Sequence, residues 1–221
     1  MKVSYYKIGK EFSRVKKSYL NRLGLIFTKG DFINSKSNFL FEKKISNLLK
    51  VKYTCGVANG SDALEVGMLA LGIKKGDEVI TATNSWVSSL TSIINIGAKP
   101  ILVDVDDDFN IDCKMLKKAI TKKTKAIMPI HLNGLPANMS EIMKISKKYK
   151  IKVVEDSAQA ILSKIDNKYA GTIGHIGCFS MHPTKNLGVA GDGGFIVTNN
   201  KIFFDKMKLI SNHGMDKKVN Q

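Results

Sequence analysis

The chain has 221 residues, of which 43% are hydrophobic and 24% charged, and its formal net charge is +16 at pH 7. This length fits one large domain, and the composition is that of an ordinary globular protein without low-complexity segments. Only Arg14 and Arg22 are arginines, so lysine carries almost all of the positive charge. Because recognition of bases and phosphates favours arginine, and the lysines stand singly or in pairs on predicted helix faces, we do not expect a nucleic-acid partner.

Three cysteines, Cys55, Cys113 and Cys178, lie far apart and form neither a CxxC pair nor a metal-binding spacing. We therefore expect reduced thiols, no metal site and a cytoplasmic protein. The N-terminal residues lack the apolar core of a signal peptide, and no stretch approaches the ~20 apolar residues of a membrane span. No membrane partner is expected either.

The predicted elements alternate between helices and strands along most of the chain. Residues 1–36 have mixed character and are expected to form an arm or irregular segment, after which apolar residues at helical spacing predict a helix from Ser37 to about Leu49. A strand at 53–57 leads through a glycine turn into a helix at 61–71. The pattern continues with strands at 78–82, 100–105, 125–132 and 151–155, and with helices at 85–96, 112–120 and 140–149.

After Asp156 the alternation changes to short strands joined by glycine turns, expected at 169–177, 178–181 and 195–198, before a helix at 203–211. The repeated β-α-β order predicts an α/β fold with a mostly parallel sheet between helices. We therefore expect one domain over residues 37–221, preceded by the N-terminal arm.

Ligands of open α/β sheets bind at the carboxyl ends of the strands, and three candidate groups fall at such places. The first is Gly60 with Ser61, where a strand turns into a helix. Free backbone N–H groups, a hydroxyl and the positive helix end would hold an anion there. The alternative is that Ser61 is only the N-cap of the helix.

The second group is a pair of carboxylates at the end of a strongly apolar strand. Glu155 and Asp156 are predicted to point in opposite directions, because successive side chains of a strand alternate. A buried carboxylate needs a cationic partner, and a protonated pyridine nitrogen would supply one. A helix-capping aspartate is the alternative.

The third group is Lys185, which stands in a turn shaped by Pro183 and several glycines, five residues after Ser180. Such a lysine can form a Schiff base beside a bound phosphate, whereas in a chain so rich in lysine it can also be an ordinary surface residue. Phosphate turn, strand-end aspartate and lysine, in this order, are what a pyridoxal phosphate site requires.

Seven segments extend this pattern along the chain: 58–64 (ANGSDAL), 76–80 (GDEVI), 129–134 (PIHLNG), 155–160 (EDSAQA), 179–188 (FSMHPTKNLG), 191–194 (GDGG) and 212–214 (NHG). In their order they resemble the DegT/DnrJ/StrS family of pyridoxal-phosphate-dependent sugar aminotransferases. The resemblance runs from about Gly30 to Gly214. It implies the large domain of a fold-type-I transferase.

The resemblance also implies pyridoxal 5'-phosphate as the cofactor and assigns residues to it. Lys185 would form the Schiff base and carry the proton, and Asp156 would pair with the ring nitrogen. Gly60, Ser61 and Ser180 would hold the phosphate, Trp86 would stack on the ring or else belong to the core, and Gln159 would approach the ring oxygen. His131 and His182 are expected to be structural.

The implied reaction transfers an amino group, usually from glutamate, to a keto sugar carried on a nucleotide, for surface polysaccharides or glycosylated metabolites. Such enzymes are homodimers, so we expect self-association. Two features depart from the family. Asn133 replaces a tyrosine that is common there, which concerns the sugar pocket, and the smaller C-terminal domain with its Gly-x-Asn-x-Arg segment is absent from this sequence.

The main alternative is a truncated, catalytically silent fragment that binds the cofactor or a partner chain. A second is a sugar dehydratase, in which histidine replaces the lysine, and the presence of Lys185 argues against it. A nicotinamide site is not favoured, because residues 188–194 do not form a Rossmann fingerprint that opens a helix after a strand.

Overall fold

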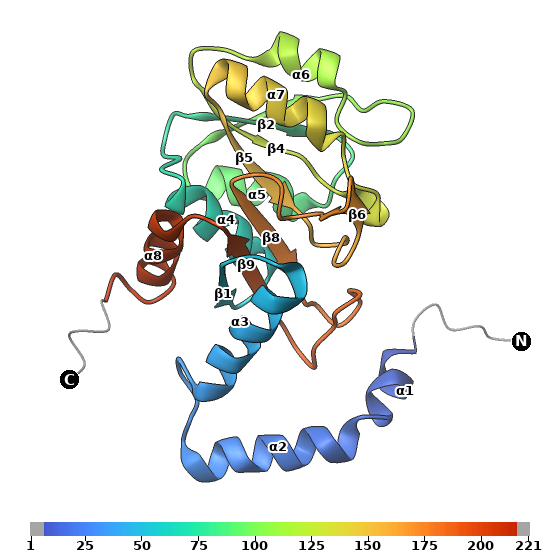
Figure 1. Ribbon diagram of the computed structural model, residues 1–221, viewed down its shortest axis with the longest axis vertical. Helices are drawn as coiled ribbons and strands as arrows, with labels where there is room; N and C mark the ends of the chain where they lie inside the picture. Colours follow the sequence, from blue (N-terminus) through green and yellow to red (C-terminus); the bar gives the residue numbers. More distant parts are fainter. Residues whose placement is uncertain (1–6, 216–221) are drawn as a thin grey trace, which may run out of the picture.

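The computed structural model describes residues 7–215 (Figure 1), so the predictions that concern 1–6 and 216–221 lie outside the described residues. A seven-stranded sheet with the order β1-β9-β8-β5-β4-β2-β3 forms its centre. Its strands are β1 (Tyr53–Val57), β2 (Glu78–Ala82), β3 (Lys99–Val103), β4 (Thr124–Met128), β5 (Lys152–Asp156), β8 (Ile176–Ser180) and β9 (Gly194–Thr198). In this sheet β9 runs against its neighbours and the other strands run in one direction, which confirms the predicted α/β class.

Helices cover both faces of the sheet. One face carries α4 (Gly60–Ala70), α5 (Val87–Asn95) and α8 (Lys201–Ile210), and the other carries α3 (Lys36–Leu49), α6 (Cys113–Ala119) and α7 (Met139–Tyr149). The alternation within β5 shows how the two layers arise. Val154 packs with Leu64 of α4, whereas its neighbour Val153 packs with Ile142 of α7.

The N-terminal segment, expected to form an arm or irregular segment, contains two helices. Residues Ile8–Ser13 form α1 and Lys16–Lys29 form α2, which Gly30 ends in a left-handed conformation with φ of 63°. No residue of α2 is buried, and Figure 1 shows this helix apart from the sheet. Because α2 does not pack on a core, its sequence lacks the clear apolar stripe at helical spacing from which most helices are predicted.

The strand predicted at 169–177 was also wrong. The structure has a two-residue hairpin there, β6 (Lys164–Ile165) with β7 (Lys168–Tyr169), and then a turn before β8. The N–H groups of Gly171, Ile173 and Gly174 donate to the carboxylate of Glu155, so they are not available to a strand ladder. Similarly β4 ends at Met128, and Leu132–Gly134 form a short 3₁₀ turn, η1.

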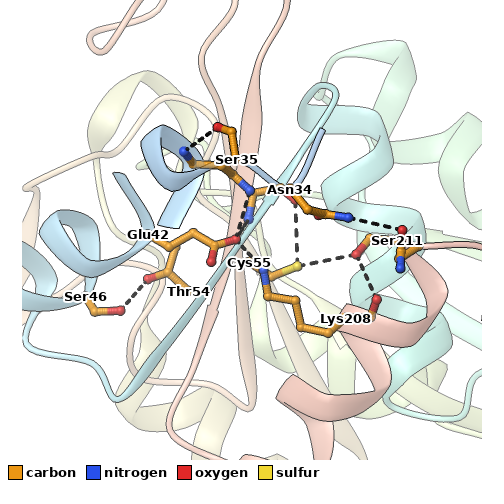
Figure 2. A network of polar contacts seen from close by, with 11 residues as sticks. Asn34, Ser35, Glu42, Ser46, Thr54, Cys55, Lys208 and Ser211 are labelled. Carbon is orange, nitrogen blue, oxygen red and sulfur yellow. Dashed lines mark hydrogen bonds and ion pairs between the residues drawn. The ribbon is translucent and has the colours of Figure 1, made fainter. Parts of the chain in front are cut away.

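The edge strand β1 is covered by side chains of α3, as Figure 2 shows. The Glu42 carboxylate accepts a hydrogen bond from the Gly56 N–H at 2.8 Å and pairs with the Lys208 amine of α8 at 2.5 Å. The Ser46 and Thr54 hydroxyls lie 2.7 Å apart. These contacts satisfy the Gly56 N–H of the open edge and tie α3 to the strand that leads into the Gly60 turn.

Within residues 7–215 the helices are all too short or too polar to cross a bilayer.

Candidate active site

A cavity of about 760 Å³ lies at the carboxyl ends of the strands and contains every site residue predicted from the sequence. The parallel direction of β1, β2, β4, β5 and β8 brings these ends to one edge of the sheet. The residues that line the cavity include Gly60, Ser61, Trp86, Asp156, Gln159, Ser180 and Lys185. They come from segments up to 125 residues apart in sequence, from Gly60 to Lys185.

Gly60 begins α4 and touches the end of β8. A Cβ atom at this position would lie 2.7 Å from the Ser180 Cβ, so any larger residue would push the two segments apart. The close approach places the Ser180 hydroxyl beside the first turn of α4. Backbone N–H groups of a first helical turn have no acceptor within the helix, which suits this corner to an anion.

The N-cap of α4 is Asn59, not Ser61. Its side-chain oxygen accepts the Asp62 N–H at 2.8 Å. Ser61 therefore lies inside the first turn and lines the cavity, which leaves its hydroxyl available to a ligand. The capping alternative for Ser61 was wrong.

Asp156 ends β5 and is buried, with 6% of its surface exposed. Its carboxylate accepts the Ser89 hydroxyl at 2.8 Å and the Ala158 N–H at 3.2 Å. Burial raises the pKa of Asp156 above its ordinary value, and these two hydrogen bonds together with the positive charge of Lys185 only partly oppose that effect. Both direct donors are neutral, so the carboxylate is suited to a cationic ligand atom in the cavity.

Lys185 occupies a tight turn, and its N–H donates to the His182 carbonyl at 2.8 Å. The turn closes at Gly188, where a Cβ atom would lie 2.6 Å from the Pro183 carbonyl oxygen. The ring of His182 stands 3.0 Å from the Thr184 hydroxyl within the same turn. The turn thus fixes the backbone of Lys185, a residue that lines the cavity and whose charge acts on the Asp156 carboxylate.

Trp86 and Gln159 complete the wall. Trp86 is the residue before α5 and is 71% exposed, so it is no part of the hydrophobic core, and its ring borders the cavity. The Gln159 side-chain oxygen accepts the Asn133 N–H at 2.8 Å, which leaves its amide NH₂ group as a donor. Both residues have a side that a planar ligand in the cavity could contact.

Two residues of this region were not foreseen as functional. Ser89 is fully buried on α5, and its hydroxyl donates to the Asp156 carboxylate. The sequence signal that could have identified Ser89 is the presence of a serine on the apolar face of a predicted helix. His131, expected to be structural, lines the cavity and bonds Glu155. Glu155 points away from Asp156 to the opposite face, as the alternation predicted.

The chemistry of these donors fits pyridoxal phosphate. A buried carboxylate would meet the ring nitrogen, a lysine amine would meet the aldehyde, and the Gly60 corner would meet the phosphate. Among residues 7–215 no cluster of three or more His, Cys, Asp and Glu side chains is placed to hold a metal ion.

Comparison with known proteins gives three consistent findings. The model of the DegT/DnrJ/EryC1/StrS aminotransferase family matches residues 14–221. A UDP-N-acetyl-3-dehydro-α-D-glucosamine 3-aminotransferase from Acidithiobacillus ferrooxidans is 40% identical over 204 residues, which are 92% of this chain and 55% of the relative. A GDP-perosamine synthase from Escherichia coli O157:H7 is 40% identical over 187 residues, or 83% of this chain and 51% of the relative.

The solved structures agree with these relatives. The structure of ntda from Bacillus subtilis with bound cofactor PMP is 35% identical in sequence, with a TM-score of 0.89, and the match covers 100% of this chain and 50% of that one. This neighbour contains the cofactor class that the sequence predicted. The chain spans about half the length of the curated relatives it matches.

The contact between Gly60 and Ser180 predicts the effect of one methyl group. We expect Gly60→Ala to lower the free energy of unfolding by about 1–3 kcal/mol, because the added Cβ overpacks the corner. Gly24→Ala is the matched control: nothing lies within 4 Å of its Cβ position in α2, so this change should raise stability by up to about 1 kcal/mol. Urea unfolding measures both changes. Adding Ser180→Gly to the Gly60→Ala variant should recover part of the lost free energy of unfolding, because it removes the side chain that the new Cβ meets. Equal effects at the two glycines would contradict the close approach.

The buried Asp156 predicts a pH dependence for the cofactor-free chain. Since its folded-state pKa is raised, its stabilising contribution is complete below the ordinary aspartate pKa and is lost as the pH rises through the folded-state pKa. As the pH rises above about 4, the parent should therefore lose stability relative to Asp156→Asn, which does not titrate. Urea unfolding at several pH values measures this. If the free energy of unfolding depends on pH in the same way in both proteins, the pKa of Asp156 is not raised in the free chain.

Proposed function

Because the chain belongs to the DegT/DnrJ/EryC1/StrS aminotransferase family, we propose that it is the cofactor-binding part of a pyridoxal-phosphate-dependent sugar aminotransferase. The observation that carries this proposal is the meeting of Lys185, Asp156 and the Gly60 corner in one cavity. Each group alone has an ordinary structural explanation. Together they match the three chemically distinct parts of a single cofactor.

Pyridoxal phosphate, when bound, supplies an aldehyde that takes up the amino group and a ring that accepts electrons. Asp156 would keep a proton on the ring nitrogen, and its burial would strengthen that interaction. The Lys185 amine would remove and return the proton at the substrate carbon. Gly60, Ser61 and Ser180 would hold the phosphate, Trp86 would cover the ring, and Gln159 would contact the ring oxygen.

The amino acceptor would be a keto sugar linked to a nucleotide, and the donor would be glutamate. Support comes from the relatives, whose names include a UDP-sugar aminotransferase and a GDP-perosamine synthase. The positive net charge of +16 would help to attract a doubly charged nucleotide sugar. The product would enter surface polysaccharides or glycosylated metabolites.

Self-association as a homodimer in the cytoplasm is the expected state. The exposed apolar side chains of α2, among them Leu20, Leu25 and Phe27, support an interaction with another surface. The three cysteines lack disulfides, which suits a reducing compartment.

The function predicts a glutamate-dependent half-reaction. With pyridoxal phosphate and glutamate, the parent should form 2-oxoglutarate, and Lys185→Ala should reduce the rate by about a thousandfold, since a positioned acid–base group contributes 10²- to 10⁴-fold. Lys147→Ala, a change in the last turn of α7, should have no effect. A coupled dehydrogenase assay measures the keto acid.

The same assay separates the alternative of a catalytically silent fragment that binds the cofactor or a partner chain. A parent chain that binds the cofactor but forms no keto acid would favour that alternative over the enzyme. Equal rates for the parent and Lys185→Ala would refute the role of the lysine.

A further inference from the structure

Glu155 is a fully buried carboxylate that receives four N–H donors. Its Oε1 accepts the N–H groups of Ile173 at 2.8 Å and Gly174 at 2.5 Å, and its Oε2 accepts the Gly171 N–H at 2.8 Å. The His131 Nε2 lies 2.9 Å from the same Oε2, and both side chains have no exposed surface. A group surrounded by donors must be acceptor-only, so Glu155 is an ionised carboxylate.

The tautomer of His131 follows from its other nitrogen. The Ala137 N–H donates to Nδ1 at 3.0 Å, so Nδ1 carries no proton. The ring proton is therefore on Nε2 and points to Glu155. The imidazole is neutral and held from both sides, with Ala137 just before α7 and Glu155 on β5.

This pair lies directly behind Asp156. The Asp156 N–H donates to the Pro129 carbonyl at 2.9 Å, and the His131 N–H donates to the Asp156 carbonyl at 3.0 Å. These two bonds join the segment after β4 to the end of β5 at the residue that faces the cavity. Any shift of the His131 segment is therefore passed to the backbone of Asp156.

We propose that Glu155 and His131 are positioning residues of the cofactor site: they lock the segment after β4 and the 171–174 turn onto β5, and so hold Asp156 in place for the cofactor ring. Neither residue needs to touch the cofactor for this role. The inference rests on the proposed function for its ligand, whereas the tautomer of His131 is a property of the free chain.

Glu155→Gln is the decisive variant, because it keeps the shape and removes the acceptor-only character. Its amide nitrogen must replace one carboxylate oxygen, and either position faces two N–H donors. We expect the dissociation constant for pyridoxal phosphate to rise about tenfold, by analogy with the loss of affinity of at least about tenfold when a group that orients a metal ligand is altered.

The matched control is Glu78→Gln, which changes another buried carboxylate at the opposite end of the sheet, where β2 begins. A merely structural role would lower the unfolding temperature in both variants and leave both dissociation constants unchanged, and that result would overturn the proposal. A rise in the dissociation constant confined to Glu155→Gln supports it.

Nitrogen-15 NMR of the cofactor-free chain supplies a second readout, with the His131 signals assigned by their loss in His131→Gln. The parent should show a neutral ring with its proton on Nε2, and Glu155→Gln should lose this pattern. An imidazolium or an Nδ1-protonated ring in the parent would contradict the hydrogen bond from the neutral His131 ring to Glu155, and with it the proposal. If the parent binds no pyridoxal phosphate, the proposed function fails, and the NMR experiment still decides whether the pair exists.

Discussion

Asp156 is a carboxylate that the fold takes out of water without supplying a cation in direct contact. The Ser89 hydroxyl and the Ala158 N–H stabilise it in part, and burial nevertheless raises its pKa. A buried carboxylate without a cationic partner lowers the stability of the free chain. A protonated ring nitrogen in the adjoining cavity would be such a partner, because it would find a fixed counter-charge in a region of low dielectric.

The remainder of the site depends on the direction of the strands. Because β1, β5 and β8 run the same way, the Gly60 corner, Asp156 and the lysine turn after Ser180 come to one edge of the sheet. The contact of Gly60 with Ser180 sets how closely two of these ends approach. On the reverse face, Glu155 gathers four N–H donors and stabilises the segments behind the cavity, so adjacent residues of one strand serve opposite faces.

Much of this arrangement could be predicted from local sequence. The strands expected at 53–57 and 78–82 coincide with β1 and β2, and the order of glycine turn, aspartate and lysine located the cavity residues. What could not be predicted depends on contacts between distant segments. The 171–174 turn is not a strand because its N–H groups go to Glu155, and Ser89 gains its role only when α5 packs against the end of β5. The helix α2 escaped detection because no core shapes its sequence, although Gly30 marks its end.

The chain has 35 basic residues, of which all but two are lysine, and the proposed function requires that one of them, Lys185, reacts with the cofactor aldehyde. Borohydride reduction in the presence of pyridoxal phosphate, followed by peptide mass spectrometry, tests it most directly. The cofactor mass should be fixed on Lys185, and a visible absorption band should be lost on reduction. Labelling spread over exposed lysines, or none at Lys185, would contradict it.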